Sequence, residues 1–222
     1  VAHQSVYFHG SPIPIPASCR FPIIRAVDDT TFVLADQRSD KKAKNLWVMN
    51  SEGAILSNFE AGDAISNILP CPNGIAVTYF DEAFGSSRSL DGLVYFDYEG
   101  KVVFHHSELD CYCACSVGKN HLLTLFYPEF YIRLFDLRTG KHTAWEAPHT
   151  LAGAAAVTCV GDVAYFHGNY DDRSIIHRWE FGATNASSID HYNSVLRGIR
   201  GGMFIATGTA GYTLVSIAPG II

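Results

Sequence analysis

Short apolar segments of strand length alternate with polar turns along almost the whole chain. One phrase recurs at 46–53, 93–100 and 132–140: an apolar stretch is closed by Asn or Asp, and a Gly follows three or four residues later. Endings of this kind are typical of β-hairpins. The glycines are spaced by 47 and 40 residues, and such a spacing indicates a propeller or a solenoid.

From residue 22 onward, the same pattern divides the chain into units of four strands. No segment has sustained helical periodicity, so we expect almost no helix. Only three strands are predicted in the last unit, while residues 2–9 provide a spare strand at the N-terminus. The predicted strands are 23–27, 31–36, 45–50, 54–59; 65–69, 75–80, 93–97, 102–106; 111–117, 121–126, 131–136, 142–146; 155–160, 163–168, 174–180, 188–191; and 195–199, 203–207, 212–217.

The sequence therefore predicts an all-β fold, a five-bladed β-propeller of four-stranded antiparallel blades. We expect the N-terminal strand to complete the last blade, because this would leave no open sheet edge. One domain would span residues 1–222, and a β-sandwich is the alternative, although it would not explain the recurrence. The predicted blades are approximately 22–62, 63–108, 109–150, 151–192, and 193–222 plus 1–10.

Over essentially its whole length, the pattern resembles the five-bladed β-propeller class. Residues 72–85, which begin with Pro72-Asn73-Gly74, are similar to a segment of uncharacterised propeller-like proteins. The resemblance implies a fold and no single activity, since this class includes lectins, arabinan- and fructan-cleaving glycosidases, and nucleotidases.

Composition narrows the classes of function. The chain has 222 residues, 48% of them hydrophobic and 17% charged, with a net charge of −6, which is typical of a soluble globular protein. Nucleic-acid binding normally needs a basic face and is disfavoured. No apolar run reaches the roughly 18 to 20 residues of a membrane-spanning helix. We expect a cytoplasmic protein that does not associate with membranes, but removal of a leader before Val1 stays open.

The cysteines and histidines do not follow the spacing of a metal site. Cys111, Cys113 and Cys115 occupy alternate positions, so on a regular strand they would all face one side and pack as small hydrophobic side chains. The paired spacing of zinc ligands is absent, and the ten histidines are scattered. We predict no metal, no cofactor and no disulfide framework.

Two arginines are candidate ligand-binding residues. Arg25 and Arg197 occupy equivalent positions on the first strands of the first and fifth predicted blades. These blades would be neighbours in a closed ring, and two guanidinium groups near its axis could bind a carboxylate or a phosphate. The alternative is that each arginine pairs with a structural acid or a carbonyl group.

The loops between the second and third strands of the blades are the other candidate site. They place Arg38, Asp81, Glu82, Tyr170 and Asp171 where a polar recognition surface could form. Two carboxylates across a pocket could also cleave a glycoside, but acids at loop ends commonly cap turns, and we favour this interpretation. The chain has no nucleophile-elbow motif, so we predict no catalytic residue.

The prediction for function is a non-catalytic propeller that binds a protein or a small ligand through one loop face. Such a module should expose an apolar patch, for example around Tyr127, Phe130 and Tyr131. The alternative is a carbohydrate-active protein, a glycoside hydrolase or a lectin, with a sugar site at the mouth of the channel.

Overall fold

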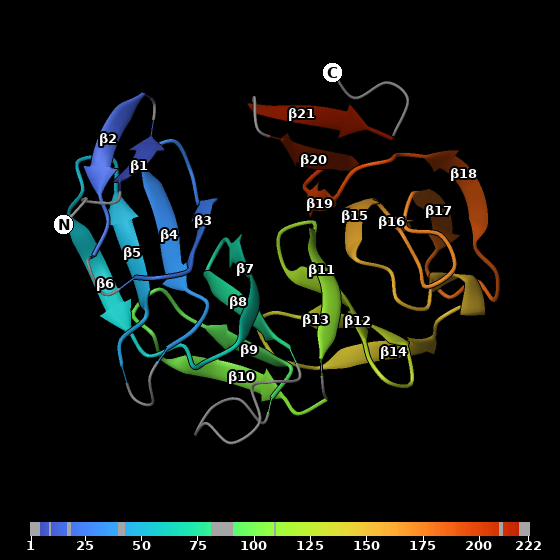
Figure 1. Ribbon diagram of the computed structural model, residues 1–222. Helices are drawn as coiled ribbons and strands as arrows, with labels where there is room; N and C mark the ends of the chain where they lie inside the picture. Colours follow the sequence, from blue (N-terminus) through green and yellow to red (C-terminus); the bar gives the residue numbers. More distant parts are fainter. Residues whose placement is uncertain are drawn as a thin grey trace. The chain divides into compact units, whose positions relative to one another are not determined.

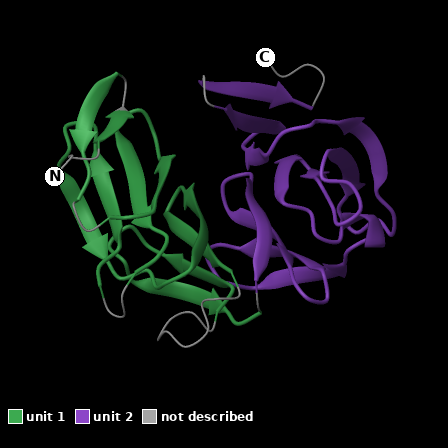
Figure 2. Ribbon diagram, in the orientation of Figure 1, with its two compact units in different colours: residues 1–109 green, residues 110–222 purple. Residues whose placement is uncertain are grey.

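The computed structural model describes residues 5–8, 10–16, 19–39, 43–80, 91–108, 110–208 and 211–217 (Figure 1). These residues form β-strands and one short 3-10 helix, η2 (His149–Leu151). None of the helical segments in this part of the chain is long and apolar enough to cross a membrane. The chain divides into two compact units, Val1–Leu109 and Asp110–Ile222 (Figure 2). The expectation of one domain over residues 1–222 stays a prediction.

Unit 1 contains two four-stranded sheets. In each sheet, neighbouring strands are consecutive in the sequence and antiparallel, as in a propeller blade. The first strands of the two blades contact each other. The first blade consists of β3 (Pro22–Ala26), β4 (Thr31–Asp36), β5 (Leu46–Asn50) and β6 (Ile55–Phe59), and the second of β7 (Ile65–Cys71), β8 (Gly74–Tyr79), β9 (Leu93–Phe96) and β10 (Val102–His106).

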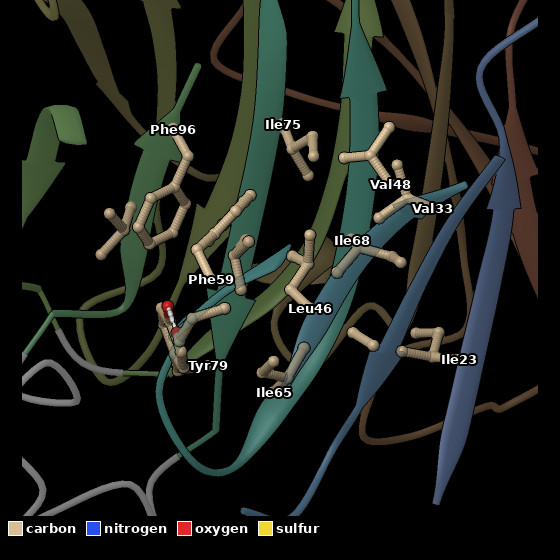
Figure 3. Packing of buried hydrophobic residues seen from close by; sticks show 14 of the residues in the cluster. Ile23, Val33, Leu46, Val48, Phe59, Ile65, Ile68, Ile75, Tyr79 and Phe96 are labelled. Carbon is tan, nitrogen blue, oxygen red and sulfur yellow. Dashed lines mark hydrogen bonds between the residues drawn. The ribbon is translucent and has the colours of Figure 1, made fainter. Parts of the chain in front are cut away.

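The core of unit 1 lies between its two blades. Val33 and Val48 come from the first blade, and Ile68, Ile75 and Phe96 come from the second (Figure 3). All five side chains are 3% exposed or less. Their burial removes apolar surface from water, which is the main favourable contribution to folding. This shared core explains why the two blades form one compact unit.

Unit 2 contains three further sheets with the same strand order. The first strands of its three blades, β11, β15 and β19, contact one another, so these blades meet at their inner strands. The blades consist of β11 (Cys111–Val117), β12 (His121–Phe126), β13 (Tyr131–Asp136) and β14 (His142–Glu146); β15 (Ala156–Val160), β16 (Val163–His167), β17 (Ile175–Glu180) and β18 (Ser187–His191); and β19 (Leu196–Ile199), β20 (Met203–Gly208) and β21 (Gly211–Ser216).

The fold is therefore all-β, with the blades of a five-bladed β-propeller, as the sequence predicted. The boundaries of the strands agree with the predicted ones to within a few residues. Among the described residues, the fifth blade has three strands, and this number was also expected from its pattern.

The N-terminal strand differs from its prediction. Instead of completing the fifth blade, β1 (Ser5–Phe8) pairs with β2 (Ser11–Pro14) in a separate two-stranded sheet. Gly10, directly before β2, has φ +82°, a conformation that glycine adopts without steric cost. Val6 and Ile13, which are paired across the hairpin, pack against a cluster of blade one that includes Trp47. Because this apolar face is nearby in the sequence, a local hairpin can bury Ile13 on it.

All six cysteines are free and buried. The expectation that Cys111, Cys113 and Cys115 share one face was wrong for Cys111. A β-bulge between Cys111 and Cys113 makes Cys111 face Phe126, while Cys113 faces Leu125. These partners are adjacent on β12, so their side chains lie on opposite faces of the sheet. The extra residue of a bulge reverses the alternation, and only Cys113 and Cys115 join the core between blades three and four.

The three tryptophans are divided between the units. Trp47 is buried in unit 1, on β5. In unit 2, Trp145 and Trp179 lie against each other, with ring centroids 5.7 Å apart and planes at 71°. The side chain of Trp179 is fully buried, and its Nε1 donates a hydrogen bond of 2.8 Å to the Ala183 carbonyl.

Candidate functional site

Four aromatic rings gather at one end of the third and fourth blades. Tyr112 lies on β11, Tyr127 and Phe130 lie between β12 and β13, and Tyr170 lies between β16 and β17. We call these four residues the aromatic cluster. The start of a first strand and the loop between second and third strands lie at the same end of a blade, so the topology brings the four together. The cluster therefore joins two blades of unit 2.

The rings of the aromatic cluster contact one another closely. Tyr112 and Tyr127 are stacked, with centroids 5.8 Å apart and planes at 5°. Phe130 makes T-shaped contacts with Tyr112 and Tyr170, with ring centroids 5.8 and 5.7 Å apart. The hydroxyl oxygens of Tyr112 and Tyr170 are 2.7 Å apart. Burial and this hydrogen bond raise the pKa of Tyr112, so its hydroxyl stays protonated at neutral pH.

The aromatic cluster is also open to solvent. Tyr127 is 40% exposed and Tyr170 is 49% exposed. Aromatic rings held in fixed positions at the surface are typical of binding sites, because they offer a large contact area with few rotatable bonds. The neighbouring Tyr131 is exposed too, and the guanidinium group of Arg133 lies 5.2 Å from its ring centroid.

The loop that carries Tyr170 is ordered by Asn169. The side-chain oxygen of Asn169 accepts hydrogen bonds from the backbone N–H groups of Asp171 and Asp172, at 3.0 and 2.6 Å. Its amide nitrogen donates to the Thr150 carbonyl at 2.9 Å. An Asn side chain that satisfies its own turn in this way is a common loop-forming device. It holds the Tyr170 ring in place before any ligand arrives.

Beside the aromatic cluster, unit 2 has a pocket of about 510 Å³. Arg173 belongs to both features, because it lines the pocket and its guanidinium carbon lies 5.8 Å from the centroid of the Tyr170 ring. A mostly apolar pocket with a few polar groups is typical of small-ligand sites of this size. The pocket is lined by Ala155, His167, Asp172, Arg173, Ser174, Asn193, Ser194, Val195 and Leu196.

The polar groups of the pocket have defined protonation states. His167 is 3% exposed, and its Nε2 donates to the Tyr192 carbonyl at 3.1 Å. Burial lowers the pKa of His167, so the ring is neutral at pH 7 and its Nδ1 is an acceptor. Hydrogen bonds from Ser174 lower the pKa of Asp172, which is therefore a carboxylate. The pocket thus offers an acceptor, an anion and the Arg173 cation.

We expect the stability of the protein to fall as the pH drops below about 6.5, partly through His167. The pKa of this buried ring is lower in the folded state, so the unfolded state binds more protons between the two pKa values. The free energy of unfolding decreases as the pH falls from the pKa of the unfolded state to just below that of the folded state. The decrease is up to about 1.4 kcal/mol per pH unit for one proton. His177, whose pKa is also lowered by burial, adds to it, while Asp172 opposes both shifts.

Thermal unfolding between pH 7.5 and 5.5 checks this prediction with His167→Gln, which cannot titrate. The variant should have a smaller pH slope than the unmodified protein. The matched control His149→Gln changes an exposed ring and should leave the slope unchanged. Equal slopes for the unmodified protein and His167→Gln would contradict the prediction.

A serine, a histidine and an aspartate meet beside the pocket, but not as a catalytic triad. The Ser174 hydroxyl donates to Asp172 Oδ1 at 2.7 Å. His191 Nδ1 lies 3.3 Å from the same hydroxyl and 3.4 Å from Asp172 Oδ2. A triad instead places serine and aspartate on the two different ring nitrogens. Asp172 also accepts from the Ser174 backbone N–H at 2.8 Å, so this arrangement is a turn cap.

The two candidate arginines have different surroundings. In unit 1, Arg25 donates to the Ile24 carbonyl at 2.8 Å and to the Asn67 side-chain oxygen at 2.7 Å. In unit 2, Arg197 is partly buried on β19, and burial lowers its pKa. Since they belong to different units, a joint anion site of the two arginines stays a prediction.

Of the predicted loop residues, the structure brings Tyr170 into the aromatic cluster. Asp171 is exposed, and its backbone belongs to the turn around Asn169. In unit 1, Arg38 Nε lies 3.4 Å from an oxygen of Asp63, and the guanidinium carbon lies 5.5 Å from the Phe80 ring centroid. Asp81 and Glu82 lie outside the residues that the structure describes. In the described ranges, no three His, Cys, Asp or Glu side chains are grouped to hold a metal ion.

Sequence reasoning missed Tyr112, and it included Arg173 only as part of the candidate loop 169–173. Tyr112 stands at the β-bulge of β11, between two buried cysteines whose side chains lie on opposite faces of the sheet, so the alternation along the sequence does not predict the face on which its ring lies. Arg173 follows Asp171 by two positions, in the loop that carries Tyr170. Arg173 could have been proposed from the pattern, but the contacts of Tyr112 and Arg173 with Tyr170 could not.

The comparisons support the fold. The chain is similar to the crystal structure of BamB from Moraxella catarrhalis, with a TM-score of 0.52 and 12% identity over 84% of this chain and 58% of that chain. It is also similar to KlAtg21 in its complex with the coiled coil of AgAtg16, with a TM-score of 0.58 and 12% identity over 84% and 63% of the two chains. Both are propeller proteins. No family model and no curated protein matches the sequence.

At this level of identity, the likeness concerns the fold alone. The chain spans about 58 to 63% of the length of these two solved structures.

Proposed function

We propose that this chain is a non-catalytic β-propeller module that binds a partner protein through the aromatic cluster of unit 2. The observation that carries the proposal is the exposure of Tyr127 and Tyr170 within a set of rings that contact one another. Tyrosine and arginine are enriched among the residues that dominate the energy of protein interfaces. Arg173 provides the charged side chain beside the rings.

The fixed positions of the rings in the aromatic cluster support the same function. The hydrogen bonds of Asn169 fix the Tyr170 loop, and the Tyr127 backbone N–H donates to the Asp110 carbonyl at 3.0 Å. Rings that are already held in place lose little conformational freedom on binding, so less of the interaction energy is spent on ordering them. The complex of KlAtg21 with the AgAtg16 coiled coil supports the general idea that a propeller of this fold can bind a helical protein segment.

Site-specific photo-crosslinking in cells tests the proposal. A benzophenone amino acid placed at Tyr127 or Tyr170 should yield the same crosslinked partner from both positions. The matched control is Ile189, which is exposed to a similar degree on the outer strand of blade four, and should yield several-fold less of that partner. With the purified partner, Tyr127→Ala and Tyr170→Ala should each weaken binding by about 2 kcal/mol, or roughly 30-fold.

The crosslinking result also separates this proposal from its rival. The pocket of about 510 Å³, with Asp172, Arg173 and His167 in its wall, favours a small polar ligand such as a sugar as the second candidate. If Tyr127 and Tyr170 crosslink no more partner than Ile189 does, the proposal of a protein partner is wrong, and the pocket becomes the better candidate site.

A further inference from the structure

Two thiols from different blades meet in the core of unit 2. The Sγ atoms of Cys115, on β11, and Cys159, on β15, are 3.1 Å apart, although the residues are 44 positions apart in the sequence. The two strands are the inner strands of blades three and four, and they contact each other. Both cysteines are buried, with 4% and 7% exposure.

The packing around these two thiols holds them against each other. Cys115 is paired with Leu123 across blade three, and Cys159 with Ala164 across blade four. All four residues belong to one apolar cluster between the blades. Because densely packed side chains are restricted to a few rotamers, the two sulfur atoms remain neighbours as long as the blades stay packed.

We propose that Cys115 and Cys159 are a site of oxidative modification, at which a disulfide bond joins blades three and four. A disulfide has an S–S distance of about 2.05 Å, so the two sulfur atoms need to approach by only about 1 Å. This proposal is independent of the proposed function.

The oxidant in this proposal is a small-molecule disulfide. The thiolate of one cysteine attacks the small disulfide, forms a mixed disulfide and releases one small thiol. The thiolate of the second cysteine then displaces the other small thiol and forms the Cys115–Cys159 bond. In total, the two protein thiols lose two electrons and two protons, and the S–S bond of the oxidant is reduced to two thiols.

Burial determines when this reaction is fast. Desolvation and the hydrogen bond with Cys159 raise the pKa of Cys115, and the thiolate is the reactive form. The folded protein therefore reacts slowly, whereas a chain that folds in an oxidising buffer still has accessible thiols. The bond should form during folding and then be protected by the core.

Such a bond would also link the two blades that carry the aromatic cluster. Tyr112 lies on β11 together with Cys115, and Tyr170 follows β16, which pairs with β15. A covalent link between β11 and β15 therefore holds together the same two blades that the Tyr112–Tyr170 hydrogen bond joins.

Refolding of the unmodified protein in a mixture of oxidised and reduced glutathione tests the proposal. Trypsin separates the cysteines, because residues 102–119 contain Cys111, Cys113 and Cys115 and residues 142–173 contain only Cys159. We expect a reducible crosslink between these two peptides, lighter than their sum by two hydrogen atoms. Alkylation after denaturation should then label four of the six thiols.

Single substitutions identify the partner of Cys159. The crosslink should persist in Cys111→Ser and Cys113→Ser and be lost in Cys115→Ser. Full alkylation of all six thiols after oxidative refolding of the unmodified chain would overturn the proposal. So would a crosslink that tandem mass spectrometry assigns to Cys111 or Cys113, a measurement that needs no variant to fold.

Discussion

Gly198→Ala is expected to destabilise the protein by about 3 kcal/mol or more, which is the upper range for overpacking. A Cβ atom at Gly198, on β19, would lie 2.6 Å from the carbonyl carbon of Val157 and closer still to its oxygen. Val157 belongs to β15, the inner strand of the neighbouring blade. The obstacle is the backbone of a strand that is paired with β16, so it cannot move aside as a flexible side chain would.

Thermal unfolding followed by circular dichroism checks this prediction, and the midpoint should fall by roughly 6 to 12 °C for a domain of this size. The matched control is Gly208→Ala, on the adjacent strand β20, where the nearest atom would be 4.0 Å from the new Cβ. This control should change the midpoint little. Equal midpoints for the two variants would mean that β15 and β19 do not approach each other as closely as the structure shows.

Trp179→Ala is expected to cost about 3 to 5 kcal/mol, as is usual when a large buried aromatic side chain is truncated. Trp179 is fully buried on β17, contacts Phe166 and Phe181 and donates a hydrogen bond to Ala183. Removal of the ring leaves a cavity between blades three and four, and it also leaves the Ala183 carbonyl without this donor.

Urea unfolding measures the loss in Trp179→Ala, and Trp179→Phe separates its causes. Phenylalanine fills part of the cavity but cannot donate the hydrogen bond, so its cost should be intermediate. The aromatic Tyr212, which is 70% exposed on β21, provides the control: Tyr212→Ala should cost less than about 0.5 kcal/mol, as exposed positions usually do. A loss in Trp179→Ala as small as that of Tyr212→Ala would contradict the assigned packing.

The blades could be predicted because their signals are local. An apolar strand followed by Asn50 or Asp97 and a glycine specifies a hairpin from a few consecutive residues, and the repeat then gives the architecture. The N-terminal hairpin was missed because the pairing partner of β1 depends on where Ile13 can be buried. The face that receives it, around Trp47 and Phe32, is known only once blade one has formed.

The candidate site was predicted only in part for a similar reason. The pattern placed Tyr127 and Phe130 in one predicted apolar patch and Tyr170 in a separate polar loop, but it contains no signal that the patch and the loop meet. Their contact depends on how blades three and four pack. The reversed face of Cys111 has a different origin, since one extra residue in a strand changes the alternation without a clear mark in the sequence.

The distribution of the tryptophans gives each unit its own optical reporter. Trp47 is the only indole of unit 1, while unit 2 holds the Trp145–Trp179 pair. Emission from a Trp145→Phe, Trp179→Phe double variant would come from unit 1 alone, and emission from Trp47→Phe would come from unit 2 alone. In each variant, a fluorescence trace that coincides with the loss of circular dichroism would show that the two halves of the chain lose their structure in one cooperative step, and a trace that departs from it would show that they unfold one after the other.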